Sequence, residues 1–177
     1  KALSFAINRK AIVENITKAE QRPAMAFVPY GIADVTSDQE FRTVGGEKYF
    51  LDDNMSEAKT LLEEAGYPDG AGFPEITILY NTNDTHQSIA QAIQQMWKEG
   101  LGINCNLMNQ EWKVYLDKRS SLDYDIARAG WIGDFMDPST FLDTFYSKSG
   151  TSDTGWMSPS YDALIESARG ANDNFLR

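Results

Sequence analysis

Hydrophobic residues recur at intervals of three and four positions in four stretches of the chain, which predicts four amphipathic helices. These stretches are residues 3–16, 58–65, 89–97 and 161–168. Asn8 is suited to act as a cap inside the first helix, and Asn54 and Asp84 are suited to cap the second and third. Gly66 and Gly100 are suited to end the second and third helices.

The chain loses this periodicity after the first helix. The Arg22-Pro23 pair predicts the end of that helix, because the residue before a proline avoids the helical conformation. Residues 24–29 are then expected to be extended. Residues 30–52 hold several Gly, Asp and Ser residues without a sustained period, so we expect an irregular excursion there.

Three other stretches alternate apolar and polar residues and predict β-strands, at residues 75–80, 103–107 and 123–129. Between the second and third strands, a helix is expected to carry Trp112, Tyr115, Leu116 and Arg119 on one side. A strand–helix–strand–helix–strand order predicts right-handed crossovers and a mostly parallel sheet flanked by helices. The fold class is therefore α/β, and we expect a single lobe over residues 1–177.

The last predicted strand leads into residues suited to ligand binding. Arg128 lies near its C-terminal end, and an inward guanidinium there needs an anionic partner. Trp131 follows a glycine and is the aromatic residue best placed to face a ligand. Asp134 comes next, and its type alone fits a turn or cap as well as a binding site. Ligands of open α/β sheets bind outside the carboxyl ends of strands, so this segment is the first candidate site.

Composition and charge narrow the class of partner. The 177 residues are 42% hydrophobic, and no apolar run is long enough to cross a membrane. The formal net charge of −10 argues against nucleic acid or an anionic membrane surface. The chain starts at Lys1 in helical spacing and stops soon after a helix, so we expect a segment of a larger protein whose signal sequence lies outside it.

Catalytic and metal chemistry find little support in the residues. His86 is the only histidine, and a histidine just inside a helix is more often a capping or surface residue. Cys105, the only cysteine, lies too far along the chain to form a metal-ligand cluster with it. Trp97 fits a core stripe, whereas Trp112 starts a helix after a strand end and fits either a core or a cleft. We therefore expect no cofactor and no metal site.

Three blocks near the strand ends resemble a known family. They read YNTNDTH at residues 80–86, MNQEWK at 108–113 and RAGWIGD at 128–134. The opening KALSFAINR and the helix end EEAGY at 63–67 resemble the same family. These blocks are similar to the periplasmic oligopeptide-binding proteins, the extracytoplasmic solute-binding components of peptide ABC importers, and the resemblance covers essentially the whole chain.

The resemblance implies one large lobe of a two-lobed, periplasmic-binding-protein-like fold that closes on a peptide. Asp134 matches the carboxylate that holds the peptide α-ammonium group. Other positions match groups around the peptide carboxylate or the pocket walls, and these are Arg128, His86, Arg119 and, more loosely because of a one-residue gap, Lys18. Trp112 and Trp131 match aromatic residues that line the pocket. After the aspartate the family more often has Tyr-Asn-Glu-Pro, whereas Phe135 and Met136 make this neighbourhood more apolar.

The resemblance further implies a monomeric, non-enzymatic protein outside the cytoplasm, either periplasmic or tethered to the outer face of the membrane. Its partners would be an oligopeptide and the permease subunits of the transporter. Alternatives on the same scaffold are a dipeptide, a murein peptide, a nickel or haem-type ligand, or a role as a peptide sensor. A hydrolase or transferase that uses Asp134 and His86 is the alternative from another class, but it would need a nucleophile or metal that the sequence does not offer.

Overall fold

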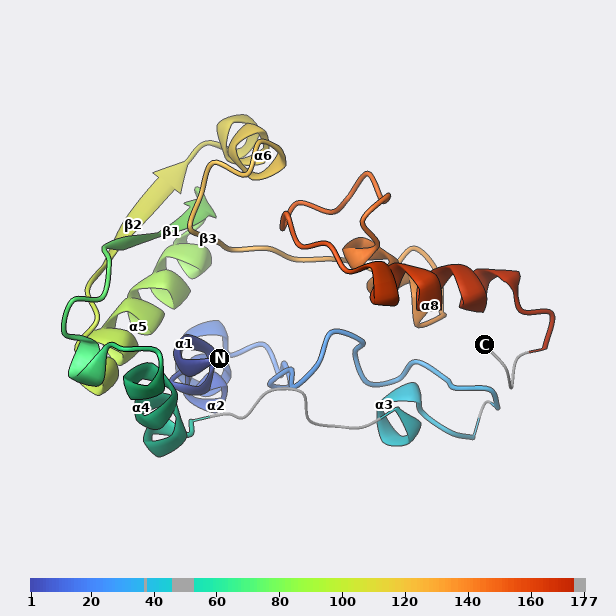
Figure 1. The fold of residues 1–177 in the computed structure, drawn as a ribbon, viewed down its shortest axis with the longest axis horizontal. Coiled ribbons are helices and arrows are strands. Elements are labelled where there is room, and N and C mark those ends of the chain that lie inside the picture. Colours follow the sequence, from blue (N-terminus) through green and yellow to red (C-terminus); the bar gives the residue numbers. More distant parts are fainter. Residues whose placement is uncertain (37, 46–52, 174–177) are drawn as a thin grey trace. The chain divides into compact units, whose positions relative to one another are not determined.

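The computed structural model describes residues 1–36, 38–45 and 53–173, and Figure 1 shows their fold. The chain divides into two compact units. Unit 1 comprises Lys1–Met25 and Phe50–Ala129, and unit 2 comprises Ala26–Tyr49 and Gly130–Arg177. The single lobe expected over residues 1–177 stays a prediction.

The centre of unit 1 is a three-stranded parallel sheet with the order β2-β1-β3. Its strands are β1 (Ile76–Asn81), β2 (Cys105–Gln110) and β3 (Ile126–Ala127). In the register, Ile78 lies opposite Leu107 of one neighbour and Ile126 of the other. The α/β class and the parallel sheet flanked by helices are confirmed.

The third strand is much shorter than the stretch 123–129 that alternation predicted. The Asp125 carboxylate accepts a hydrogen bond of 2.9 Å from the backbone N–H of Thr77, so a side chain occupies a donor that a longer strand would use. Beyond the strand, the N–H of Arg128 donates to the Leu79 carbonyl at 2.8 Å. This bond holds the exit from β3 against the central strand.

The first predicted helix is divided by its internal cap. Two short helices, α1 (Ala2–Phe5) and α2 (Arg9–Ile12), are followed by the π-helix η1 (Val13–Thr17). The Asn8 side chain accepts from the N–H of Ala11 at 2.7 Å, which confirms the interior cap. The helical path ends at Thr17, before Pro23, and residues 25–28 form bends, so the extended segment expected at 24–29 is wrong.

The remaining helices of unit 1 are α4 (Met55–Glu64), the 3-10 turn η2 (Pro68–Gly70), α5 (Asp84–Leu101) and α6 (Trp112–Ser120). Asn54 caps α4 as expected, accepting from the N–H of Glu57 at 3.1 Å. The cap of α5 is Asn83, which accepts from His86 N–H at 3.0 Å, so the prediction of Asp84 is wrong by one residue. Asn83 holds the extended backbone that a cap requires, whereas Asp84 is already helical.

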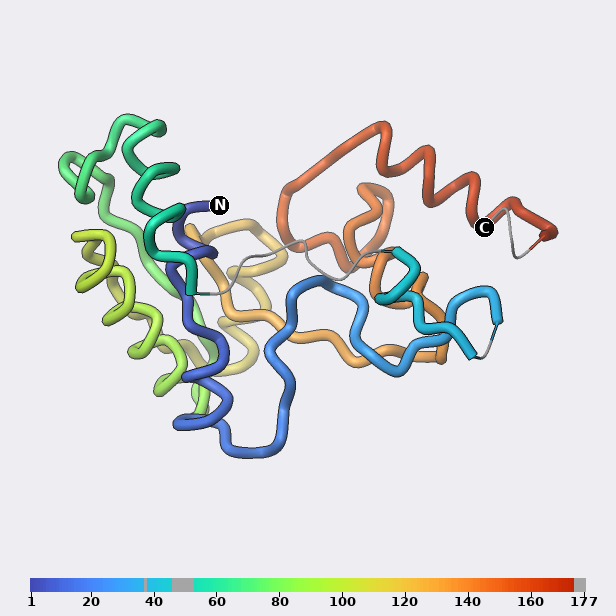
Figure 2. The backbone as a smooth tube through the Cα atoms, turned by 90° about the horizontal axis from the view of Figure 1, so that it is seen from below, coloured from blue at the N-terminus to red at the C-terminus, as the bar shows by residue number. Residues whose placement is uncertain are grey.

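The core of unit 1 lies between the sheet and the helices α1, α4 and α5. Ile78 and Tyr80 contribute the sheet side of this core, and Trp97 contributes a large side chain from α5. The Trp97 indole N–H donates to the Leu3 carbonyl at 2.8 Å, so its polar atom is also satisfied and the core assignment is confirmed. Helices α4 and α5 lie side by side, as Figures 1 and 2 both show.

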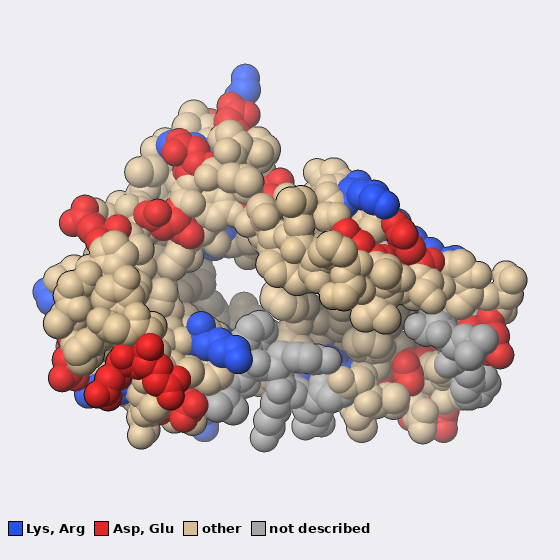
Figure 3. Space-filling model, in the orientation of Figure 1, with Lys and Arg blue, Asp and Glu red and all other residues tan. Residues whose placement is uncertain are grey.

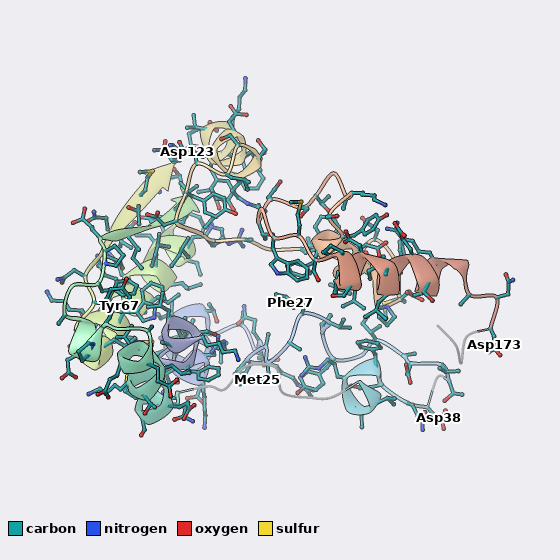
Figure 4. All side chains as sticks on the ribbon, in the orientation of Figure 1. Met25, Phe27, Asp38, Tyr67, Asp123 and Asp173 are labelled. Atoms are coloured by element: carbon teal, nitrogen blue, oxygen red, sulfur yellow. The ribbon has the colours of Figure 1, made fainter. Side chains whose placement is uncertain are left out.

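Unit 2 contains α3 (Phe41–Val44), α7 (Ser139–Leu142), the 3-10 turn η3 (Asp143–Phe145) and α8 (Pro159–Gly170). Side-chain bonds tie α8 to the segment after η3. The Glu166 carboxylate accepts from the Tyr146 hydroxyl and from Lys148, both at 2.7 Å. Phe27, labelled in Figure 4, packs on Phe145 with ring centroids 4.4 Å apart. Leu164, expected to be buried, is 70% exposed.

Acidic side chains are prominent on the surface. On the face shown in Figure 3 they gather over the region of α4, whose sequence contains three glutamates. Among the described helices, none combines the length and the apolar character needed to cross a membrane.

Gly102, the residue after α5, offers a test of this packing. It has φ +69°, and a Cβ there would lie 2.3 Å from the Asp69 carbonyl oxygen. We expect Gly102→Ala to destabilise the protein by about 3 kcal/mol or more, because backbone strain adds to a clash with backbone. Gly66 has φ +90° with open space around it, so Gly66→Ala should cost only about 1 kcal/mol. Urea unfolding measures both, and equal losses would contradict a close approach at Gly102.

Candidate functional site

The strand order creates a switch point between β1 and β3. The chain leaves β1 through α5 to reach β2 on one side, and it leaves β2 through α6 to reach β3 on the other side. The segments that follow β1 and β3 therefore diverge from adjacent strand ends. Ligands of open α/β sheets bind at such a point.

A cavity of about 380 Å³ lies in unit 1 beside these strands. His86 comes to it from the first turn of α5, and Arg128 comes to it from the exit of β3. The rest of the lining is mostly apolar and includes Leu3, Ile7, Ile78, Ile89, Ile93 and Trp97. His86 and Arg128, which are 42 positions apart in the sequence, thus border the same mostly apolar cavity.

The electrostatics of His86 and Arg128 favour the binding of an anion. Burial and then the positive charge of Arg128 lower the pKa of His86, while the backbone of Asn81 acts in the opposite direction. The His86 Nδ1 atom is buried and has no hydrogen-bond partner among the described residues. Within the same described ranges, no carboxylate forms an ion pair with Arg128. A ligand carboxylate would satisfy both groups.

Tyr115 connects α6 to this region. Its side chain is fully buried, and its hydroxyl donates to the Arg128 carbonyl. Arg119 donates to the same hydroxyl at 3.3 Å, and Trp112 stacks on the Tyr115 ring at 5.4 Å. Sequence reasoning placed these three residues on one side of the helix but missed Tyr115 as the positioning residue. Its spacing of three from Trp112 and four from Arg119 was the available signal.

The shared side of α6 is not a buried face, as a core helix would have. Trp112 and Leu116 are exposed, and only Tyr115 is buried. Trp112, which sequence left open between core and cleft, is therefore available to a ligand. Lys18 is also exposed, at the left-handed residue that ends η1, and it does not line the cavity of His86 and Arg128.

Trp131 and Asp134 belong to unit 2, whereas the other five predicted site residues belong to unit 1. The N–H of Asp134 donates to the Thr140 hydroxyl at 3.0 Å. Gly133 lies so close to α7 that a Cβ there would be 2.8 Å from the ring of Phe141. The Asp134 carboxylate is exposed, and no group in the described part of the chain bonds to it. The backbone of Asp134 is therefore held in place, while its carboxylate is open to solvent.

Comparison with known proteins identifies the family of the chain. Residues 1–153 match the family described as "Bacterial extracellular solute-binding proteins, family 5 Middle". The chain belongs to this family. It is 42% identical over its whole length to the oligopeptide-binding protein OppA of Bacillus subtilis, and 38% identical over 97% of its length to the periplasmic murein peptide-binding protein MppA of Escherichia coli.

Solved structures of the family agree in fold. The chain matches Haemophilus influenzae OppA, crystallised in complex with RPPGFSPFR, with a TM-score of 0.83 and 34% identity over 99% of its length. It matches an oligopeptide-binding protein from Borrelia burgdorferi with the same TM-score and 35% identity over 98% of its length. The chain spans about a third of the length of these relatives, 32% for the Bacillus subtilis protein and 34% and 33% for the two structures.

The Tyr115 hydroxyl provides a test of how the site is held. We expect Tyr115→Phe to lower the free energy of unfolding by about 1–2 kcal/mol, because the Arg128 carbonyl would lose its donor. Tyr80→Phe is the matched control, since Tyr80 is also buried but its hydroxyl has no bond within the described residues. That change should stay within about 0.5 kcal/mol. If the two variants lose similar amounts of unfolding free energy, the Tyr115 hydroxyl does not position Arg128.

Proposed function

We propose that this chain is one lobe of a longer two-lobed protein that captures oligopeptides outside the cytoplasm and delivers them to an ABC importer. One observation carries the proposal: the Arg128 guanidinium and the Asp134 carboxylate both lack ion-pair partners in the described residues. Each would complement one charged end of a peptide with free termini. The names of the family relatives, which bind oligopeptides, murein peptides and dipeptides, support this ligand class.

In this proposal, different residues bind the two charged ends of the peptide. Asp134 would hold the α-ammonium group, because a desolvated ammonium without an anionic partner is costly. Arg128 and His86 would receive the carboxylate, with Arg119 or Lys18 taking this role for peptides of other lengths. Aromatic surface for the peptide between its ends would come from Trp112 and Trp131. Closure of the two lobes would add the enclosure that one lobe lacks.

The proposed protein is a monomeric binding component and not an enzyme. Burial raises the pKa of the Cys105 thiol, which is the opposite of what an activated nucleophile needs. Its further partners would be the permease subunits of the transporter, and it would work in the periplasm or tethered to the outer face of the membrane. A dipeptide or murein peptide is the second candidate ligand, favoured by relatives of 35% and 38% identity with those names.

The ammonium anchor can be tested by calorimetry on the longer protein with tripeptides that carry a free or an acetylated N-terminus. We expect acetylation to weaken binding by at least about 100-fold, because it removes the charge that Asp134 pairs with. Asp134→Asn should weaken binding of the free peptide to a similar extent and make acetylation matter little.

Glu63→Gln is the control for the loss of one negative charge, since Glu63 is exposed on α4 in the other unit. It should leave the affinity unchanged. Equal binding of free and acetylated peptides by the unaltered protein would reject the Asp134 anchor, and a lack of binding to both would reject the peptide class of ligand.

The proposed contact between His86 and the peptide carboxylate predicts that affinity depends on pH. In the free protein the pKa of His86 lies below its ordinary value, so the imidazole is neutral near pH 7. A bound carboxylate raises that pKa, so binding takes up a proton and strengthens as the pH falls toward the free-state pKa. We expect affinity to rise steadily as the pH falls from 7.0 to 5.5. Calorimetry in buffers of different ionisation enthalpy measures the proton uptake.

His86→Gln should bind without this proton uptake and with a flatter pH profile. The peptide ammonium stays largely protonated over this range, so it adds little to the pH dependence. An identical profile in the variant and the unaltered protein would place the titrating group elsewhere.

A further inference from the structure

The loop that carries Asp134 leaves four large apolar side chains in solvent. Trp131 is 44% exposed, Ile132 89%, Phe135 55% and Met136 76%. A single exposed apolar residue is ordinary on a protein surface, but residues 131–136 carry four of them, two before and two after Gly133 and Asp134. We call Ile132, Phe135 and Met136 the apolar rim.

The loop that holds the apolar rim is fixed by its own hydrogen bonds. Ahead of Phe135, the N–H of Asp134 is bonded to the Thr140 hydroxyl at 3.0 Å. Within the loop, the N–H of Asp137 donates to the Phe135 carbonyl at 3.0 Å and closes a tight turn around Met136. After the turn, the Asp137 carboxylate accepts from Ser139 N–H at 2.9 Å. The rim side chains are thus presented by an ordered backbone, although none of them is buried.

The geometry of an amino terminus brings a ligand side chain to this rim. An ammonium bonded to the Asp134 carboxylate lies about 2.8 Å from it. The first side chain of a peptide branches from the carbon next to that nitrogen, one bond of about 1.5 Å away. Ile132 and Met136 are two residues from Asp134 in the chain, so their Cα atoms lie within about 7 Å of its Cα. The first side chain must therefore pass close to the residues that flank the carboxylate.

We propose that the apolar rim makes this site prefer peptides whose first residue is apolar, an inference that rests on the proposed function. A leucine at that position would cover exposed rim surface and remove water from both partners. An asparagine of nearly the same size would lose water from its amide without a polar partner on the rim. In hydrophobic pockets small differences of this kind correspond to about tenfold in affinity or more, and for the open rim we take the lower end of that range.

Calorimetry on the longer protein with Leu-Ala-Ala and Asn-Ala-Ala, each with a free or acetylated N-terminus, tests the preference. We expect the free leucine peptide to bind about tenfold tighter than the free asparagine peptide. In Phe135→Gln/Met136→Gln the ratio should fall to about two or less. Met136→Gln alone changes a side chain already in solvent, and it should reduce the ratio about threefold even if the double variant does not fold.

Leu164→Gln is the matched control, because Leu164 is also exposed in unit 2 but lies on α8. It should keep the tenfold ratio. A ratio near one in the unaltered protein, with acetylation still weakening binding strongly, overturns the preference that we assign to the apolar rim. It leaves the Asp134 anchor intact. A tenfold ratio that survives in the rim variants also overturns it, since other residues would then set the preference. Equal binding of free and acetylated peptides rejects the Asp134 anchor on which the inference rests, and a lack of binding to all four peptides rejects the proposed function itself.

Discussion

The pairing of β1 with a parallel strand on each side is the constraint on which the rest of unit 1 depends. A central parallel strand needs cover on both faces, and Ile78, Leu79 and Tyr80 are accordingly all buried. The same pairing puts the ends of β1 and β3 next to each other and sends the chain away from them in different directions. His86 and Arg128 meet at one cavity for this reason, although neither is near the other in sequence.

The site also depends on groups that a ligand would not touch. Tyr115 fills the interior beside the sheet with its ring and holds the Arg128 carbonyl with its hydroxyl. The same ring supports Trp112 by stacking, and its hydroxyl receives Arg119. One buried side chain thus contacts the backbone of Arg128, the guanidinium of Arg119 and the indole of Trp112. In unit 2, the Thr140 hydroxyl plays a comparable part, because it is buried and holds the backbone of Asp134.

Sequence alone predicted most of the features that depend on neighbouring residues. The caps at Asn8 and Asn54, the helix and strand order and the parallel sheet follow from side-chain type and periodicity. It misplaced the cap of α5 by one residue and wrongly predicted an extended segment at 24–29, and its other failures lie where a distant group or the covering of a face decides. The length of β3 depends on a carboxylate bonding to Thr77, and the exposure of Leu164 depends on how α8 packs. Of the candidate site, the pairing of His86 with Arg128 could be expected from strand ends and from the family resemblance. The role of Tyr115 could not, because it needs the contact across α6 and β3.

The division of the chain into units and the order of the strands in the sheet have a consequence for synthesis of the chain. Unit 1 takes residues from before Ala26 and again from Phe50 to Ala129, so the segment between them belongs to unit 2. The central strand lacks one edge partner until Ile126 and Ala127 have left the ribosome. During that time, the unpaired backbone groups of β1 and its apolar side chains are exposed to non-native contacts and aggregation. The nascent chain is therefore most vulnerable to misassociation between the emergence of β1 from the ribosome and the emergence of Ala127, and slower translation during that interval would prolong the exposure.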